Sequence, residues 1–268
     1  MHNDNARPVE TTLTSIRIVR EIERQNGASM TEIAEALDLG KSTVHNHLAT
    51  LTKEGFLVRQ DQCYSVGLGF LQLGEYARNR REVYRPAKME VYRLAESTNE
   101  EVNFAVAENG FMYSIEYMMG DPSPANPEAG SQFLEVGSRF HMHNSAPGKA
   151  VLAELPSERI ERILQLRGLP ATTDETITER DTLLSELEAV QEQGYATNNE
   201  ELERGYRSVG APVHQSDGSV FGALSIGGPA YRFHVDSSSE SGSIDALLAA
   251  VERVEDEIAQ TATTEPRS

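Results

Sequence analysis

The chain contains a single cysteine, Cys63, and no run of 18 apolar residues. One cysteine excludes an internal disulfide framework and a cysteine-rich zinc site. Because Cys63 has apolar neighbours in sequence, we expect it to pack rather than to react. The absence of a long apolar run argues against a membrane-spanning helix. The first residues, MHNDNARPVETT, also contain no signal-peptide hydrophobic region, so we expect a soluble, cytoplasmic protein with no membrane partner.

Lysine is scarce: only four of the 24 basic residues are lysine, and 42 acidic residues give a net charge of −18. The charge is unevenly distributed. Residues 1–83 hold 10 basic and 11 acidic side chains, whereas residues 84–268 hold 14 and 31. An acidic, lysine-poor chain suits a cytoplasm of very high salt, where charges are screened over a few ångströms. A halophilic source is therefore a hypothesis, and an acidic protein from an ordinary-salt organism is the alternative.

A helical periodicity stands out in Lys41–Leu57, KSTVHNHLATLTKEGFL. At 3.6 residues per turn its apolar residues fall on one face and short polar side chains on the other. A second amphipathic segment, Met30–Leu37, precedes it, and Asp38-Leu39-Gly40 forms the turn, with Leu39 as an apolar pin and Gly40 free to adopt positive φ. The pattern predicts a helix-turn-helix, with an ordinary helical hairpin as the alternative.

The flanking segments favour a winged helix over residues 12–66. Leu13–Arg24 is a third amphipathic helix, and residues 56–58 and 64–66 read as two short strands around Arg59-Gln60-Asp61-Gln62. Small polar side chains can reach base edges and cations can contact phosphates. The base-edge candidates are Ser42, Thr43, His45 and Asn46, and the phosphate candidates are Thr31, Lys41, Lys53 and Arg59. His47 lies toward the core side and is expected to pack there.

After the winged helix, the sequence predicts a linker helix over residues 67–85 and a second domain over residues 86–260. Pro86 marks the boundary between them, because proline is well placed at a helix N-terminus. The two ends of the chain, residues 1–11 and 261–268, are expected to be flexible. The apolar face of the linker helix is a natural dimer contact. Residues 102–107 and 111–117 form a hairpin around Asn109-Gly110, and residues 208–214 and 220–227 form another around Asp217-Gly218. A strand is expected over 133–142, loops over 120–131 and 236–243, and a closing helix over 245–260. Helices alternating with antiparallel hairpins indicate an α+β domain.

At this point the chain resembles the IclR family of transcription regulators. The first domain carries the resemblance through MTEIAEALDLGKSTVHNHLATLTKEGFLVR and CYSVGLGFLQLG. The second carries it through SRFHMHNSAPGKAVLAELP and GYATNNEELERGYRSVGAPVHQSDGSVFGALSIGGP. The resemblance covers nearly all of residues 12–260. It implies a GAF-like effector domain, homodimers or dimers of dimers, and control of a promoter by a small organic, sugar or aromatic acid.

The sequence departs from the family pattern at several places. Asn46 and His47 stand where arginine followed by leucine is common, and because asparagine pairs with adenine whereas arginine favours guanine, a different operator is expected. His141 replaces a usual proline, Ser208 a frequent cysteine and Asn198 a frequent acid. The effector pocket should therefore differ from those of the best-known members.

The effector candidates lie in the second domain. The turn Ser145-Ala146-Pro147-Gly148 opens a helix whose N–H groups could bind a carboxylate, with Lys149 adding a cation; an N-cap with close packing is the alternative. The resemblance places Asn198 and Ser208 in the pocket. Apolar walls are expected from Ile115, Met118 and Leu134, although a core role is equally compatible with these residues.

Other candidate chemistry is weak. His141 and His143 alternate on a predicted strand, but no third metal ligand is evident, so no metal or cofactor is expected. Glu200, Glu201 and Glu203 form an acidic cluster near the pocket mouth, which we expect to be a solvated turn; acid/base work by paired carboxylates is the alternative. No Ser/His/Asp or Cys/His arrangement, Walker loop or dinucleotide motif is present. The sequence therefore predicts a DNA-binding regulator of a catabolic operon, with double-stranded DNA and a small metabolite as partners. An enzyme or a ligand-independent scaffold that uses the winged helix for protein contacts is the alternative.

Overall fold

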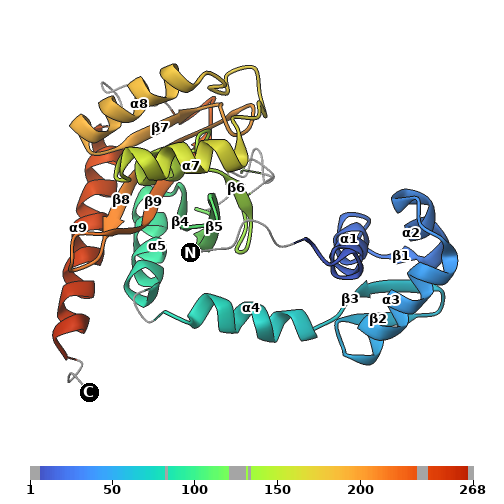
Figure 1. Cartoon of the computed structure of the whole chain (residues 1–268). Helices are drawn as coiled ribbons and strands as arrows, with labels where there is room; N and C mark the ends of the chain where they lie inside the picture. Colours follow the sequence, from blue (N-terminus) through green and yellow to red (C-terminus); the bar gives the residue numbers. More distant parts are fainter. Residues whose placement is uncertain (1–6, 82–83, 121–130, 132–133, 234–240, 265–268) are drawn as a thin grey trace. The chain divides into compact units, whose positions relative to one another are not determined.

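The computed structural model describes residues 7–81, 84–120, 131, 134–233 and 241–264. The chain divides into two compact units, Met1–Arg80 and Arg81–Ser268, and each is described by itself (Figure 1).

The first unit is a winged helix followed by a separate helix. Its elements are α1 (Glu10–Arg24), β1 (Ala28–Ser29), α2 (Met30–Leu37), α3 (Lys41–Lys53), β2 (Leu57–Gln60), β3 (Cys63–Val66) and α4 (Gly69–Asn79). The strands form an antiparallel sheet of order β1-β3-β2. The apolar stripes of the three helices meet in one core, which contains Ile18, Ile22, Ile33, Val44 and Leu48. The predicted winged helix is confirmed.

Three local predictions for this unit are wrong. Helix α1 begins at Glu10, inside the stretch expected to be flexible, and residues 1–6 lie outside the described residues. Strand β2 runs through Arg59 and Gln60, so the wing turn is only Asp61 and Gln62. The two-residue strand β1 was not predicted, because two residues carry no periodicity. In α4, which is shorter than the predicted linker helix, no residue is buried.

The second unit is built on a six-stranded antiparallel sheet of order β6-β5-β4-β9-β8-β7. The strands are β4 (Glu101–Glu108), β5 (Phe111–Met118), β6 (Arg139–His141), β7 (Ala196–Asn199), β8 (Tyr206–His214) and β9 (Val220–Pro229). The helices are α5 (Tyr84–Thr98), α6 (Ala146–Ala153), α7 (Ser157–Arg167), α8 (Arg180–Gln193) and α9 (Ser241–Thr264). The α+β prediction is confirmed.

Helices cover both faces of this sheet (Figure 1). Helices α5 and α9 pack on one face through a core that includes Val91, Phe104 and Leu247. Helices α6, α7 and α8 enclose a second core on the other face, which includes Met112 and Leu152. Both predicted hairpins are present. Asn109 (φ 53°) and Gly110 (φ 76°) form the β4–β5 turn, because this turn needs two residues that tolerate positive φ.

The structure also corrects boundaries in the second unit. The strand predicted over 133–142 is reduced to Arg139–His141, because residues 135–137 belong to a turn closed by Ser138 N–H donating to the Glu135 carbonyl. Helix α5 begins two residues before Pro86. Helix α9 includes residues 241–243 of the predicted loop and 261–264 of the predicted flexible terminus. The remainder of the predicted loops 120–131 and 236–243 lies largely outside the described residues.

Candidate nucleic-acid interface and effector site

The helix-turn-helix is fixed by a capping box at its first helix. Ser29 Oγ accepts a hydrogen bond from Glu32 N, and the Glu32 carboxylate accepts one from Ser29 N, which satisfies two N–H groups at the start of α2. The turn is made by Asp38, at φ 52°, whereas Gly40 has φ −62°. The prediction that Gly40 supplies the positive φ is therefore wrong; aspartate tolerates the left-handed region well enough to end α2. Leu39 packs against the core as expected.

Helix α3 separates a buried face from an exposed polar face. Val44 and Leu48 are fully buried, which fixes the rotation of the helix. All eight predicted DNA-contacting side chains are exposed: Thr31, Lys41, Ser42, Thr43, His45, Asn46, Lys53 and Arg59. No described residue hydrogen-bonds the Asn46 side-chain amide, so both its donor and its acceptor are available to a base edge.

Two further residues of this unit test sequence-based expectations. His47 is half-buried, and its Nδ1 lies 2.8 Å from Ser15 Oγ, so it ties α3 to α1 as expected of a packed histidine. Cys63 is exposed, so its expected packing role is wrong: the alternation along β3 turns Tyr64 inward and Cys63 outward. On the wing, Arg59 donates to the Asp61 carbonyl at 2.9 Å and lies over the Tyr64 ring.

In the second unit, the predicted turn at the start of α6 is buried and capped. Ser145 Oγ accepts a hydrogen bond from Gly148 N at 3.2 Å and donates to the His141 carbonyl at 2.9 Å. Lys149 N donates to the Ser145 carbonyl, and Pro147 has no N–H. Most donors at this helix start are thus committed within the chain, as the N-cap alternative anticipates. The turn packs directly on β8 at Gly210, where a Cβ would lie 2.8 Å from Pro147 N.

Asn198 and Ser208, which the resemblance places in the pocket, lie side by side. They are neighbours across β7 and β8, and Asn198 Nδ2 donates to Ser208 Oγ at 3.3 Å. The Asn198 side-chain oxygen accepts from Glu201 N and Leu202 N at 2.9 and 3.1 Å. Asn198 therefore shapes the loop that follows β7, and its side chain is fully buried.

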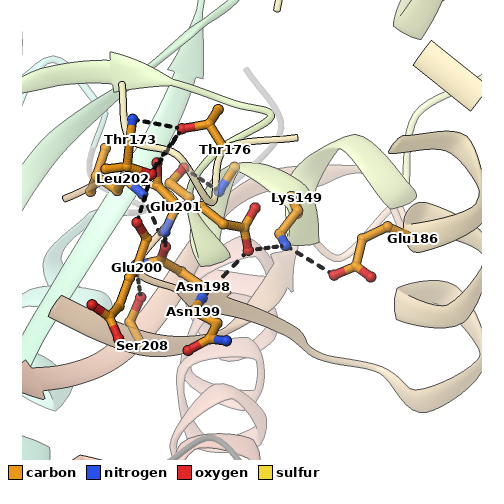
Figure 2. Close-up of polar contacts among 12 residues, drawn as sticks. Lys149, Thr173, Thr176, Glu186, Asn198, Asn199, Glu200, Glu201, Leu202 and Ser208 are labelled. Carbon is orange, nitrogen blue, oxygen red and sulfur yellow. Dashed lines mark hydrogen bonds and ion pairs between the residues drawn. The ribbon is translucent and has the colours of Figure 1, made fainter. Parts of the chain in front are cut away.

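That loop is anchored by a buried ion pair (Figure 2). Lys149 Nζ lies 2.7 Å from Glu201 Oε1 and 2.9 Å from Glu186 Oε1. Burial raises the pKa of Glu201, and the Lys149 charge opposes that rise. The expectation of a solvated glutamate turn is wrong for Glu201, and Lys149 is engaged by carboxylates of its own chain. Nothing in the local sequence reveals the pairing, since its members lie 37 and 52 residues apart.

Threonines hold the same loop from the other side (Figure 2). Thr176 Oγ1 donates to the Glu201 carbonyl at 2.7 Å, and Thr173 Oγ1 donates to the Glu200 carbonyl at 2.8 Å. Glu200 has φ 63° and its carboxylate accepts from Gly205 N, which closes the loop.

A cavity of about 390 Å³ opens beside this loop, within the size range of small-molecule sites. Of the predicted pocket residues, only Leu134 lines it; Ile115 instead packs toward the core under α5 and α9, and Met118 is 38% exposed. Sequence reasoning weighed His141 as a metal ligand and as a departure from the family's pocket pattern, and it placed Glu203 in a solvated turn near the pocket mouth. It missed the other lining residues. Apart from Leu134, the lining consists of Arg139, Phe140, His141, Asn144, Thr172, Thr173, Leu202, Glu203 and Arg204.

The two histidines of this region, His141 and His143, lie close together. Their ring centroids are 5.4 Å apart, and His143 Nε2 lies 3.2 Å from the Pro170 carbonyl. Within the described part of the chain, no three His, Cys, Asp or Glu side chains gather in a way that could hold a metal ion. Burial lowers the pKa of His143 to about 4, so this ring is neutral at pH 7.

None of the described helices has the length and apolar content needed to cross a bilayer.

Comparison with known proteins decides the family. The helix-turn-helix domain of IclR regulators matches residues 15–61, and the C-terminal domain of bacterial IclR transcriptional regulators matches residues 76–256. The chain belongs to the IclR family of transcriptional regulators. The resemblance inferred from the sequence is thereby confirmed.

IclR-family relatives match along most of their length. The chain is 30% identical to a probable HTH-type transcriptional regulator ArcR of Halobacterium salinarum, over 92% of each chain. It is 29% identical to the HTH-type transcriptional regulator KdgR of Escherichia coli, over 87% of each. Among solved structures, the Thermotoga maritima IclR aligns with a TM-score of 0.73 at 24% identity, over 93% of this chain and 97% of that one. An IclR homolog from Microbacterium hydrocarbonoxydans, complexed with 4-hydroxybenzoate, aligns with a TM-score of 0.76 at 21% identity, over 93% and 99%.

Two departures from the usual IclR pattern now have a structural setting. His47, where leucine is common, pairs with Ser15 and still serves the core side of α3. His141, where proline is usual, lines the cavity.

Proposed function

We propose that this protein is a metabolite-responsive regulator of a catabolic operon, which reads its operator through the outer face of α3. The observation that supports this most directly is the exposed polar row on α3, in which Asn46 presents an amide that no described residue engages. Ser42, Thr43 and His45 extend the row toward base edges, and Thr31, Lys41, Lys53 and Arg59 provide phosphate contacts around it. The protein acts by binding, without a catalytic step.

The effector occupies the second unit. The cavity bounded by Leu134 and the loop after β7 is the place where a small acid can enter. Beside it, Asn198 with Ser208 shapes that loop, and Ser145–Gly148 caps the start of α6. A solved IclR homolog holds 4-hydroxybenzoate, which supports an organic acid as the ligand class. Ligand binding favours one placement of paired winged helices over another and so changes operator affinity.

The regulator acts as a homodimer or a dimer of dimers. Support comes from α4 and the residue before it: Leu68, Leu71, Leu73 and Tyr76 are more than half exposed, and they form an apolar surface that a second copy would cover. A dimer binds two half-sites related by symmetry, so the operator should be an inverted repeat.

The test is selection of bound sequences from a random DNA pool by the full-length chain, carried out in molar KCl and repeated at low salt. We expect a single inverted-repeat motif to be enriched at both salt concentrations, because base contacts persist when counterion release contributes little. Enrichment of no motif at either salt concentration would contradict the proposal and favour a protein-contact role for the winged helix.

A further inference from the structure

One polar contact joins helix α3 to another helix of the winged helix. His47 Nδ1, on α3, lies 2.8 Å from Ser15 Oγ, on α1, although the two residues are 32 positions apart in the sequence. Both residues are half-buried. Among the described residues, no other side-chain hydrogen bond links α3 to α1 or α2, and the three helices otherwise meet through their apolar core.

The contact holds for either tautomer of the histidine ring. Ser15 Oγ also lies 3.2 Å from the Thr11 carbonyl, one turn earlier on α1, and a carbonyl can only accept. If the hydroxyl hydrogen goes to Thr11, the ring donates from Nδ1–H to Ser15; if it goes to the ring, Nδ1 accepts it. The bond therefore holds α1 to α3 whichever ring nitrogen carries the proton.

His47 acts at the side of α3 rather than at its buried centre. Val44 and Leu48 are fully buried and mark the direction of the core. At 3.6 residues per turn, His47 lies about a quarter turn from that direction, and Asn46 lies on the opposite side of the helix. The core contacts fix which side of α3 points inward, and the bond from His47 resists rotation of the helix about its own axis.

Rotation of α3 matters because base reading depends on short, directed contacts. Apolar packing is not directional, whereas a hydrogen bond weakens steeply when its distance or angle changes. Side chains end about 5–6 Å from a helix axis, so a rotation of about 10° moves the Asn46 amide by about 1 Å. A shift of that size breaks at least one bond of a two-bond contact between asparagine and adenine.

We propose that His47 is a positioning residue, which through Ser15 sets the rotation of α3 and hence the base edge that Asn46 reaches. Neither Ser15 nor His47 contacts a base in this account. A hydroxyl on α1 therefore contributes to sequence preference from outside the DNA-facing surface. The inference deepens the proposed function and rests on it, because it takes α3 as the helix that reads the operator.

The test measures base discrimination by fluorescence anisotropy, with the full-length chain, its selected operator and every single-base variant of that operator. Asn46→Ala first identifies the base position that Asn46 reads. Ser15→Ala and His47→Leu each remove the bond between α1 and α3. In both variants we expect discrimination at that position to fall from about tenfold or more to within about threefold. The salt slope should stay at the wild-type value, because no phosphate contact is lost.

Three further variants separate positioning from stability. Ser15→Thr keeps the hydroxyl and should discriminate within about twofold of the wild type. Ser29→Ala removes the capping box of α2 and destabilises the same unit without touching the side of α3 that His47 occupies, so its discrimination should be unchanged. The double variant Ser15→Ala with His47→Leu should lose no more than either single variant, because both remove the same bond. Thermal unfolding reports whether each variant is folded.

Several results would overturn the inference. They are wild-type discrimination in a folded Ser15→Ala or His47→Leu variant, equal relaxation in Ser15→Thr or in Ser29→Ala, and losses that add in the double variant. A reduced salt slope would show that the two residues contact phosphates instead. A selected motif that Asn46→Ala leaves unchanged would also overturn it. Enrichment of no motif by the wild-type chain would overturn the proposed function, so the two failures are distinguishable.

Discussion

Lys149 and Glu201 form a buried ion pair that ties helix α6 to the loop bordering the cavity. Their closest atoms, Nζ and Oε1, are 2.7 Å apart, and the two residues are 1% and 7% exposed. Leu202, Glu203 and Arg204, which follow Glu201 directly, line the cavity. The pair therefore sets the position of that wall relative to the start of α6.

Replacing Lys149 alone should strongly destabilise the second unit. Lys149→Met leaves the Glu201 carboxylate buried without its cation, and removal of one partner of a buried pair costs about 3–5 kcal/mol. The free energy of unfolding in urea measures the loss. The double variant Lys149→Met with Glu201→Gln should recover a substantial part of it, since no buried charge is left unpaired. Arg204→Ala, which removes an exposed pair with Asp174, should cost about 1 kcal/mol or less. Equal losses in Lys149→Met and Arg204→Ala would argue against a buried pair.

His143 should make the protein less stable as the pH falls from 6.5 toward 4. Burial lowers its pKa to about 4 in the folded chain, against an ordinary value of 6.5. In that interval the unfolded chain binds the extra proton more readily, so acid favours unfolding, by up to about 3 kcal/mol. His143→Gln keeps a neutral donor for the Pro170 carbonyl and should flatten this part of the stability profile. Urea unfolding at pH 7, 6, 5 and 4.5 checks this, and parallel profiles for the two proteins would show that His143 does not contribute.

Gly210 should not tolerate a methyl group. A Cβ at this position of β8 would lie 2.8 Å from both Ala146 C and Pro147 N, backbone atoms that cannot move without displacing α6. We expect Gly210→Ala to destabilise by about 1–3 kcal/mol, the usual cost of overpacking. Gly74→Ala, in α4 where nothing lies within 4 Å of the added atom, should be neutral or stabilising by up to about 1 kcal/mol. Thermal and urea unfolding compare the two, and similar losses would refute close packing of α6 on β8.

Asn46 and Lys53 should differ in how they affect DNA binding. Asn46→Ala should lower affinity for the selected operator by about 1–3 kcal/mol and relax the preference at one base position, adenine in our expectation. Lys53→Ala should weaken binding to all sequences alike and reduce the salt slope by about one unit. Competition titrations with single-base operator variants, at two KCl concentrations, measure both effects. A uniform loss in Asn46→Ala would show that it does not read a base.

The amino-acid sequence alone determined the fold class, the helix-turn-helix and the family. These follow from short-range periodicity, Asn-Gly and Asp-Gly turns, and motifs that extend over tens of adjacent residues. The exposure of the six DNA-contact candidates on α3 could be predicted, because helical periodicity fixes which side of α3 is buried once Val44 and Leu48 are placed. Where local rules compete, as at Asp38 and Gly40, prediction placed the positive φ on the wrong residue.

Only the tertiary structure decided the environment of the cavity. Asn144, Thr172 and Leu202 meet because the segment before α6, the loop after α7 and the loop after β7 converge, and no periodic pattern relates residues 28 or 30 positions apart. The same folding buried Lys149 and Glu201 against each other, although the sequence had suggested an effector-binding cation for Lys149 and a solvated turn for Glu201. Periodicity along a chain reports which side of one element is apolar. The partners of a buried polar group depend on how separate elements pack, and that is settled only when they are assembled.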